Sequence, residues 1–419
     1  MELTSLEPLP ILVFSNLLMI AFLLLLSKKA FREPYTFRPW RRYMVILTSF
    51  GFCLFSFWGT DWFHYAEMYF SILYVSGFNT SLESVYSLIA AVSPNYLVFR
   101  AIIWGVALYL LCLMSKHVSL RGDLLLAVFC AVWLIDFSYG RVVMAYTMMF
   151  LGGSLLMKPI GDKRLVSLML GIVLLLLSLF FHKTAFFGVA LVILALFPRL
   201  LNKRTFVLAM IMYPFVLLMV QLLLMQFMDT AVDARDHSSS STVGQAYLNE
   251  DTREIGPAYL LYLILRYVPY YMVAWIAYKM NIYQPEAAIG SAEATEIAES
   301  TEIAESAEIA ESTEITEDSE DSETPEVPEV PSEVRFFSRL TVYCVLISTI
   351  FLFDLGANTF TLYMRFLMYA FIPGCVVLAW AWQYKFYPRL TRLTILLGLA
   401  GTCYALLYSF YVSYLGVAT

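Results

Sequence analysis

Runs of about twenty apolar residues follow one another along almost the whole chain, and they restrict its fold more than any other feature. The hydrocarbon core of a bilayer is roughly 30 Å thick, and an α-helix needs about 20 residues to cross it. Hydrophobic residues make up 60% of the sequence, and the runs are continuous, whereas the strands of a membrane barrel alternate. The sequence therefore predicts an all-α fold of the polytopic integral membrane class.

About twelve membrane spans are predicted, together with one short amphipathic helix. The short helix, about Leu82–Val92, precedes the third span and is expected to lie at the membrane interface. The first span, Leu9–Leu26, follows an acidic start, whereas a cleaved signal peptide begins with basic residues, so this span is expected to be retained. The predicted spans are 9–26, 43–58, 96–114, 123–138, 142–157, 164–181, 184–197, 205–227, 257–279, 336–353, 361–382 and 393–415.

An acidic segment interrupts the apolar pattern at Asn281–Val334, where seventeen acidic residues occur without any Lys or Arg. Glu recurs at every third position over Glu293–Glu317, and like charges at that spacing repel one another on a helix. This composition predicts a disordered linker, with a docking site for a cytosolic partner as the alternative. The domains predicted on this basis are a membrane domain at 1–280, the linker at 281–334 and a second membrane domain at 335–419.

The acidic segment also hides the charge of the rest of the chain. The chain has 27 basic and 33 acidic residues, a net charge of −6; without the segment's seventeen, sixteen acidic residues remain and the net charge is +11. Lys and Arg accumulate in the cytoplasmic loops of membrane proteins. Six of them lie between Lys28 and Arg42, and the basic residues of later loops fall on the same side. We therefore expect a cytoplasmic acidic segment, both termini outside, and long outer loops at 59–95 and 228–256.

Four arginines lie on the side that this topology places outside. Arg266 and Arg365 fall within predicted spans, and Arg100 and Arg141 stand at the outer starts of theirs. An Arg in hydrocarbon costs about 2.5 kcal/mol or more, so it usually faces a cavity or a partner. Guanidinium groups stay charged and match phosphate oxygens in two-point contacts. The four residues therefore indicate a cationic cavity that opens outward.

The sequence leaves simpler interpretations of these polar residues open. Arg100 and Arg141 could extend their charged ends to the outer headgroups, as long basic side chains do at membrane surfaces. Arg266 could pair with a buried carboxylate such as Asp354. The outer histidines, His182 among them, could simply form hydrogen bonds at the interface.

Four short motifs occur in order on the predicted outer side. The first is Asp61-x3-Tyr65-x3-Tyr69, and the second is Ser138-Tyr139-Gly140-Arg141 at the start of a helix. The third is Phe181-His182-Lys183-Thr184-Ala185 at a sharp turn, and the fourth is Arg365-x3-Tyr369. These motifs resemble those of the EpsG family, Wzy-like polymerases of exopolysaccharide and capsule. Val142 departs from the pattern, because the family commonly has Gln after the Arg of the second motif.

The resemblance covers roughly Met44–Phe197 and, more weakly, Phe336–Phe386, and it implies a reaction. Such polymerases join oligosaccharide repeat units carried on undecaprenyl pyrophosphate, at the outer face of the bacterial inner membrane. The growing chain leaves its carrier and joins a sugar hydroxyl of the next unit. A base for that hydroxyl and cations for the leaving pyrophosphate are therefore required.

The resemblance implies a role for particular side chains. His182 is the candidate base and Asp61 the second choice, while Arg365, Arg141 and Arg266 are candidates for the pyrophosphate. The further candidates for substrate binding are Trp62, His64, Tyr65, Tyr69 and Tyr139. The implied partners are the lipid-linked oligosaccharide, a chain-length regulator and a flippase of the same pathway; neither a cofactor nor nucleic acid is expected.

Two other classes of protein remain as alternatives. A ligase or another lipid-linked glycosyltransferase would use a similar site with a different acceptor. A flippase or transporter should show internal repeats or paired broken helices, and none is obvious in the sequence. A phosphate loop, HExxH and Asp-x-Asp are absent from the sequence, so a metal-dependent transferase is not favoured. The six cysteines stand singly in apolar runs and are expected to pack as small apolar residues.

Overall fold

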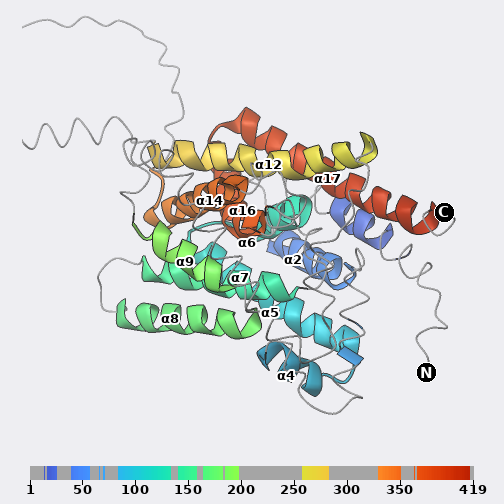
Figure 1. Ribbon diagram of the computed structural model, residues 1–419, viewed down its shortest axis with the longest axis horizontal. Helices are drawn as coiled ribbons and strands as arrows, with labels where there is room; N and C mark the ends of the chain where they lie inside the picture. The colour runs from blue at the N-terminus through green and yellow to red at the C-terminus, as the bar shows by residue number, and fades with distance from the viewer. Residues whose placement is uncertain are drawn as a thin grey trace, which may run out of the picture.

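The protein is described by a computed structural model, and all the elements that its described residues form are helical (Figure 1). The described residues are 14, 17–25, 39–56, 66, 69–70, 84–133, 140–157, 164–182, 185–197, 257–282, 329–350, 363 and 366–415. The predicted all-α fold class is therefore confirmed.

The α-helices are α2 (Pro39–Leu54), α4 (Ser84–Val92), α5 (Tyr96–His117), α6 (Gly122–Val128), α7 (Arg141–Leu156), α8 (Arg164–Phe181), α9 (Ala185–Ala195), α12 (Pro257–Ile282), α14 (Ser332–Ile350), α16 (Phe371–Gln383) and α17 (Pro388–Leu415). A π-helical turn, η2 (Phe129–Trp133), continues α6, and a 3₁₀ turn, η5 (Met368–Ala370), precedes α16.

Several helix ends differ from the predicted ones. Helix α14 begins at Ser332, so the last residues assigned to the acidic linker are helical. Helix α17 begins five residues early, at Pro388, because proline lacks an N–H and therefore suits the first position of a helix. The segment predicted at Leu82–Val92 is helix α4. The predicted span 205–227 lies outside the described residues.

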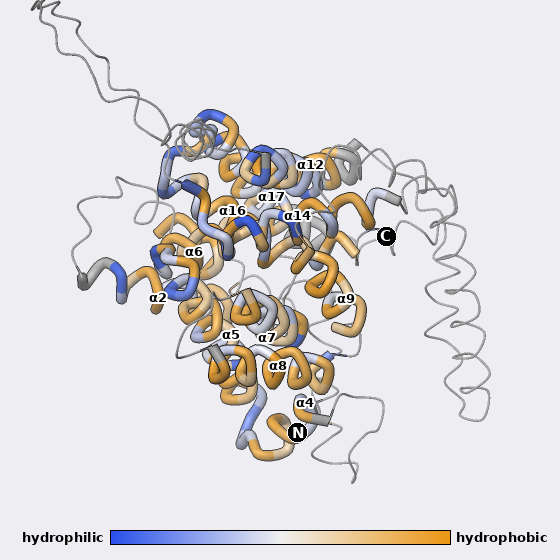
Figure 2. Tube along the Cα trace, turned by 90° about the vertical axis from the view of Figure 1, so that its left-hand side faces the viewer, coloured by the Kyte–Doolittle hydropathy of each residue, from blue (hydrophilic) through white to orange (hydrophobic). Residues whose placement is uncertain are grey.

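The outward faces of the helices are apolar. Tyr96–His117 and Pro388–Leu407 are long and apolar enough to cross a bilayer, and several shorter described helices are apolar as well. On α8, Leu165 and Val166 are each 69% exposed and Phe180 is 55% exposed; Figure 2 shows the apolar colour along this helix. A helix with large apolar side chains on its outer face suits lipid contact. The number of membrane spans stays a prediction.

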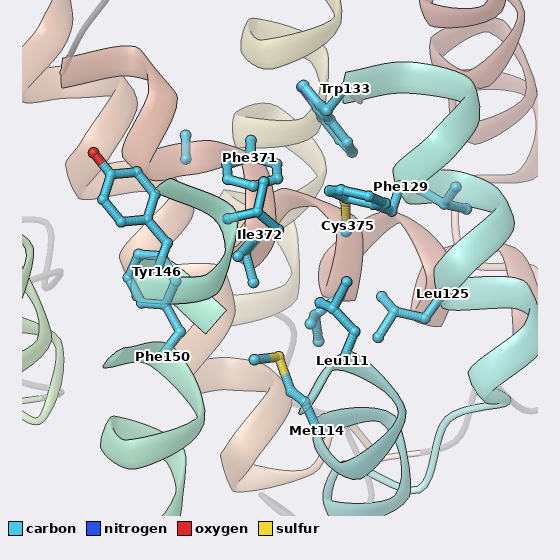
Figure 3. Packing of buried hydrophobic residues seen from close by; sticks show 14 of the residues in the cluster. Leu111, Met114, Leu125, Phe129, Trp133, Tyr146, Phe150, Phe371, Ile372 and Cys375 are labelled. Carbon is cyan, nitrogen blue, oxygen red and sulfur yellow. The ribbon is translucent and has the colours of Figure 1, made fainter. Parts of the chain in front are cut away.

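The helices form one bundle around a shared apolar core. In Figure 1, α12 and α17 lie along one edge, α8 and α4 lie at the opposite edge, and α7, α14 and α16 lie between them. The core combines side chains from α5, α6, α7 and α16 (Figure 3). All six cysteines are free, and four of them are buried, in keeping with their predicted role as small apolar residues. The residues labelled in Figure 3 are Leu111, Met114, Leu125, Phe129, Trp133, Tyr146, Phe150, Phe371, Ile372 and Cys375.

Helices α7 and α8 approach each other closely through a pair of glycines. A Cβ atom on Gly152 would lie 2.8 Å from the Gly171 carbonyl oxygen, and one on Gly171 would lie 2.9 Å from that of Gly152. Small residues let helix backbones meet in this way where the hydrophobic effect cannot drive helix association. This contact fixes the helix that carries Arg141 against the helix that ends before His182.

The π-helical turn η2 is held by α17. Such a turn departs from the regular hydrogen-bond ladder of an α-helix. The hydroxyl group of Thr402 donates a hydrogen bond of 2.8 Å to the Ala131 carbonyl oxygen within this turn. Gly398, one turn earlier on α17, permits the approach, because a Cβ atom there would lie 2.5 Å from Val132 Cγ1.

Contacts between helix ends agree with the predicted alternation of sides. His117 Nε2 lies 3.1 Å from the Ser154 carbonyl oxygen. The backbone N–H of Arg121 donates a hydrogen bond of 3.1 Å to Gln383 Oε1. All four residues lie at ends that were predicted on the same, cytoplasmic side. Which face of the bundle meets the cytoplasm stays a prediction from the Lys and Arg distribution.

Replacing Thr402 by Val is expected to lower the free energy of unfolding by about 1–3 kcal/mol, because the buried Ala131 carbonyl group loses its donor. Thr394→Val is the matched control on the same helix. Thr394 is equally buried, but it donates to the Leu390 carbonyl group of its own helix, so its loss should cost less than about 0.5 kcal/mol. Denaturant unfolding in detergent measures both values. Equal losses would contradict a role for Thr402 in holding the π-helical turn.

Candidate functional site

Arg141 begins α7 at a backbone position that requires glycine before it. Gly140 has a φ of 76°, in the left-handed region that favours glycine. A Cβ atom on Gly140 would also lie 3.0 Å from both Ile103 Cγ2 and Trp104 Cε2 on α5. The guanidinium carbon of Arg141 lies 5.6 Å from the centre of the Tyr86 ring on α4, a cation–π distance. The start of α7 is therefore packed on α5, and the charged group of Arg141 lies over α4.

His182, the candidate base, occupies the turn between α8 and α9. Its backbone N–H donates to the Ser178 carbonyl oxygen at 3.1 Å, and its carbonyl oxygen accepts from the Ala185 N–H at 2.9 Å. Both main-chain groups are thus held by the flanking helices. The imidazole is partly exposed, and its centre lies 6.4 Å from the centre of the Tyr146 ring on α7.

Tyr146 links the elements that carry three of the motifs. It lies five residues after Arg141 on α7 and is 3% exposed (Figure 3). Its ring stacks on that of Tyr369, with centres 4.6 Å apart and planes 23° apart. Gly188 on α9 makes room for this pair, because a Cβ atom there would lie 2.9 Å from Tyr369 Cε1. One buried ring therefore contacts both the His182 turn and the segment that leads into α16.

Arg365 lies outside the described residues, but residues on both sides of it are described. Tyr363 is 2% exposed, and its ring centre lies 5.6 Å from that of Tyr267 on α12. The ring centre of Phe366 lies 5.6 Å from that of Phe187 on α9. Together with the stacked tyrosine pair, these contacts join the chain around Arg365 to α7, α9 and α12.

A directed chain of hydroxyl groups orients Tyr363. Thr349 on α14 donates its hydroxyl hydrogen to the Val345 carbonyl oxygen at 2.6 Å. Because a hydroxyl group has only one hydrogen, Tyr271 must donate to Thr349 at 3.0 Å, and Tyr363 must donate to Tyr271 at 3.3 Å. This series of hydrogen bonds ends at the Val345 carbonyl group. It therefore holds the three side chains in place and cannot pass a proton onward.

Arg266 lies in a tightly packed part of α12. It is 4% exposed and directly precedes the tyrosine that packs on Tyr363. Pro269 has no N–H to donate to the Leu265 carbonyl group one turn earlier. Gly401 on α17 packs against that carbonyl group, since a Cβ atom there would lie 2.8 Å from its oxygen. The contact of Arg266 with a pyrophosphate stays a prediction.

Arg100 binds helix α2, a role that the sequence analysis did not anticipate. It is 2% exposed, and its Nη2 donates to the carbonyl oxygens of Cys53 at 3.1 Å and Ser56 at 3.3 Å. Its Nε donates to the Leu54 carbonyl oxygen at 3.2 Å. These carbonyl groups lie at the C-terminus of α2, where a positive charge interacts favourably with the helix dipole. Arg100 therefore joins α5 to α2 and is set apart from the other outer arginines.

Tyr69 is the residue of the first motif that the structure describes. It is 1% exposed, and its hydroxyl group donates to the Ser93 carbonyl oxygen at 2.7 Å. Its ring centre lies 5.4 Å from that of Phe99 and 5.5 Å from that of Tyr96. These contacts attach the end of the motif to the start of α5. The ring is covered by protein, and the sugar contact assigned to it stays a prediction.

The remaining predicted site residues lie outside the described part of the chain, and their roles stay predictions. They are Asp61, Trp62, His64, Tyr65, Tyr139 and Arg365. Among the residues that the structure does describe, no group of three or more His, Cys, Asp or Glu side chains is arranged to hold a metal ion.

Sequence reasoning missed Tyr146 and Tyr271. Both stand in apolar helices, where aromatic residues most often belong to the core, so composition does not distinguish these two tyrosines from ordinary core residues. The five-residue spacing between Arg141 and Tyr146 is also not that of helical neighbours, which are three or four residues apart.

The apolar helices are those of a membrane protein, and elements that carry three of the motifs meet at Tyr146. The model of the EpsG family matches residues 39–289, which is more than half of the chain. The chain therefore belongs to the EpsG family, as its motifs indicated. This family suggests a polymerase of polysaccharide biosynthesis. The matched residues include Arg141 and His182 but not Arg365. Comparisons with curated proteins and with solved structures gave no match.

Replacing Tyr146 by Leu is expected to lower the free energy of unfolding by about 2–3 kcal/mol, through the lost stacking and the cavity left behind. Tyr146→Phe keeps the ring and should cost less than about 1 kcal/mol. In a double-mutant cycle, Tyr146→Leu should couple to Tyr369→Leu by about 0.5–1.5 kcal/mol. The exposed Tyr109, replaced by Leu, is the control that should show no coupling. Additive losses at Tyr146 and Tyr369 would contradict the stack.

Proposed function

We propose that this protein polymerises oligosaccharide repeat units carried on undecaprenyl pyrophosphate, at the outer face of the bacterial inner membrane. The observation that carries the proposal is that one buried ring links the elements that carry three of the family motifs. Tyr146 lies on the helix of Arg141, faces His182 at 6.4 Å and stacks on Tyr369 of the Arg365 motif at 4.6 Å. The approach of these elements, which are far apart in the sequence, supports a shared site for the motif residues.

The proposed reaction is a glycosyl transfer between two lipid-linked units. The acceptor hydroxyl loses its proton to His182, with Asp61 as the second candidate, and its oxygen attacks the anomeric carbon of the donor chain. The bond from that carbon to the pyrophosphate oxygen breaks, and the carrier leaves as the lipid pyrophosphate. Imidazole suits the base because its ordinary pKa lies close to neutral pH. The partly exposed position of the His182 ring is compatible with access by a hydroxyl group.

Arginine side chains would stabilise the leaving group. Negative charge develops on the pyrophosphate as the bond breaks, and fixed cations can lower the barrier by several kcal/mol in a site that excludes water. Arg141, Arg266 and Arg365 are the proposed cations. Arg141 over the Tyr86 ring and Arg266 within the packed part of α12 are held by rigid helices, as such preorganisation requires.

The sugar-binding assignments rest on the sequence. Trp62, His64, Tyr65 and Tyr139 are proposed to contact sugar rings, through stacking and hydrogen bonds, and Tyr69 is proposed either to join them or to hold the first motif in place. A chain-length regulator and a flippase are the proposed partners of the same pathway.

Replacing His182 or Arg365 by Ala is expected to abolish long-chain glycan while leaving single repeat units on the lipid. Loss of a general base costs about 10²–10⁴ in rate, and loss of a charge-stabilising group costs about 10²–10³. The measurement is reaction of the purified full chain with lipid-pyrophosphate-linked repeat units, with product length read on a gel.

His117→Ala is the matched control for His182→Ala. His117 bonds to Ser154 at the opposite ends of α5 and α7, so its loss should leave the product ladder unchanged. Normal ladders from both the His182 and the Arg365 variants would refute the site. A wild-type chain that moves lipid-linked units across vesicle membranes without lengthening them would favour a flippase.

Deleting residues 293–326 is expected to change the polymerisation rate less than about twofold. The deletion stops before Glu329–Pro331, because Val330 is buried and its carbonyl oxygen accepts a hydrogen bond of 3.0 Å from Arg335 Nε. Met280 near the end of α12 lies 3.5 Å from Ser338 on α14, so the fifteen residues left between Ile282 and Ser332 suffice to join the two helices. Loss of product with normal membrane insertion would show that the acidic segment does more than link two parts of the chain.

A further inference from the structure

The start of α7 has the properties of an anion site. The first N–H groups of an α-helix have no partner within the helix, and together with the helix dipole they attract negative charge. Helix α7 has 16 residues, and Gly140 before it brings no side chain to accept hydrogen bonds from these groups. A helix start alone does not define a binding site, so the evidence for a ligand must come from the side chains around it.

Trp104 provides an independent indication of a ligand. Its side chain is completely buried, and the indole Nε1 makes no hydrogen bond within the part of the chain that the structure describes. The carbon bonded to this nitrogen, Cε2, lies 3.0 Å from the point where a Cβ atom on Gly140 would sit. A buried N–H group without an acceptor is costly, and most such groups in proteins are satisfied by some partner. Among the described residues this donor therefore has no acceptor, and its ring lies against the residue that precedes α7.

Arg141 completes a set of groups that offers only donors and positive charge. Its side chain is partly exposed, and its guanidinium carbon lies 5.6 Å from the centre of the Tyr86 ring. A sugar hydroxyl group would need an acceptor as well as donors, whereas phosphate oxygens accept from all of these groups. The chemistry of the donors thus selects an oxyanion, and the phosphate of the carrier is the oxyanion that the proposed substrate brings to the reaction.

We propose that the N-terminus of α7, the Trp104 indole N–H and the Arg141 guanidinium group bind a phosphate of the carrier pyrophosphate, a role that rests on the proposed function. Tyr146, which faces His182, stands five residues along the same helix, about 7.5 Å at 1.5 Å per residue. Along the helix axis, the proposed phosphate position and the residue that faces the proposed base are thus more than one turn apart. Trp104, which belongs to none of the four motifs, thereby becomes a residue of the donor site, and Gly140 gains a role beside the arginine of its motif.

The first test compares Trp104→Phe with Trp133→Phe in the full chain in detergent. Both variants lose the same ring atoms and a buried indole N–H, but Trp133, on η2, packs against Gly374 of α16 and Tyr270 of α12. Binding of geranyl pyrophosphate and of inorganic pyrophosphate is measured by calorimetry, with geraniol as the uncharged control. Trp104→Phe should weaken pyrophosphate binding about tenfold, as expected for a lost hydrogen bond to a charged group, and Trp133→Phe should not weaken it. Equal affinities in the two variants, or no binding by the wild-type chain, would overturn the proposal.

A second measurement needs no variant and remains decisive if Trp104→Phe fails to fold. Pyrophosphate should slow amide hydrogen exchange in the first turn of α7, Arg141–Val143, at least tenfold. The first turn of α5 is the internal control, because Asn95 Oδ1 already accepts from the Val98 N–H at 2.9 Å. Exchange at α7 that is unchanged by either pyrophosphate would refute the site.

These experiments distinguish the possible sources of the phosphate. They also test the anion site and the proposed function separately. Comparable binding of inorganic and geranyl pyrophosphate assigns recognition to the anion itself, and binding of the geranyl form alone assigns it to the lipid-linked anion. Pyrophosphate binding without polymerisation by the wild-type chain would refute the proposed function and leave the anion site standing. Polymerisation with wild-type pyrophosphate affinity in Trp104→Phe would refute the anion site and leave the function standing.

Discussion

Main-chain carbonyl groups at helix ends and irregular turns need hydrogen-bond donors, and hydrocarbon cannot supply them as water does. Arg100 donates to the carbonyl groups at the end of α2, Thr402 donates to the π-helical turn, and Nε of Arg339 donates to the Ala195 carbonyl oxygen at 2.8 Å where α9 ends. In each case the donor stands on a different helix from the acceptor. Satisfying the backbone therefore also connects neighbouring helices, as it does for α2, α9 and the π-helical turn held by α17.

The candidate site depends on the same close packing. Glycines stand where a neighbouring helix or ring needs the space of a side chain, as Gly152 does between α7 and α8 and Gly188 does beneath the Tyr146–Tyr369 pair. With the backbones so close, one aromatic ring can reach the elements of three motifs. The rigid surroundings also suit a reaction in which charge must be met by groups that are already in place.

Arg100 and Arg141 show where sequence reasoning stops. Each stands near the predicted outer start of an apolar helix, so the sequence left the same two roles open for both, contact with headgroups or with a ligand in a cavity. In the structure, Arg100 is 2% exposed and bound to the end of α2, while Arg141 is partly exposed and lies over the ring of Tyr86. Their partners lie some fifty residues away along the chain, and no local sequence pattern indicates a contact over that separation. The predicted roles of His182 and Arg141, by contrast, came from short motifs, which carry their information locally.

The sequence by itself determined the helical class, the apolar outer faces, the family and the separation of the acidic segment from the apolar body. These properties depend on composition, on local periodicity and on short motifs, all of which can be read along the chain. Only the tertiary structure decided that Tyr146 joins the motifs, that Arg100 belongs to the scaffold and that Trp104 stands beside the start of α7. The reason is physical: helices in a bilayer are placed by contacts between residues distant in sequence, through close packing and hydrogen bonds whose partners the sequence does not specify.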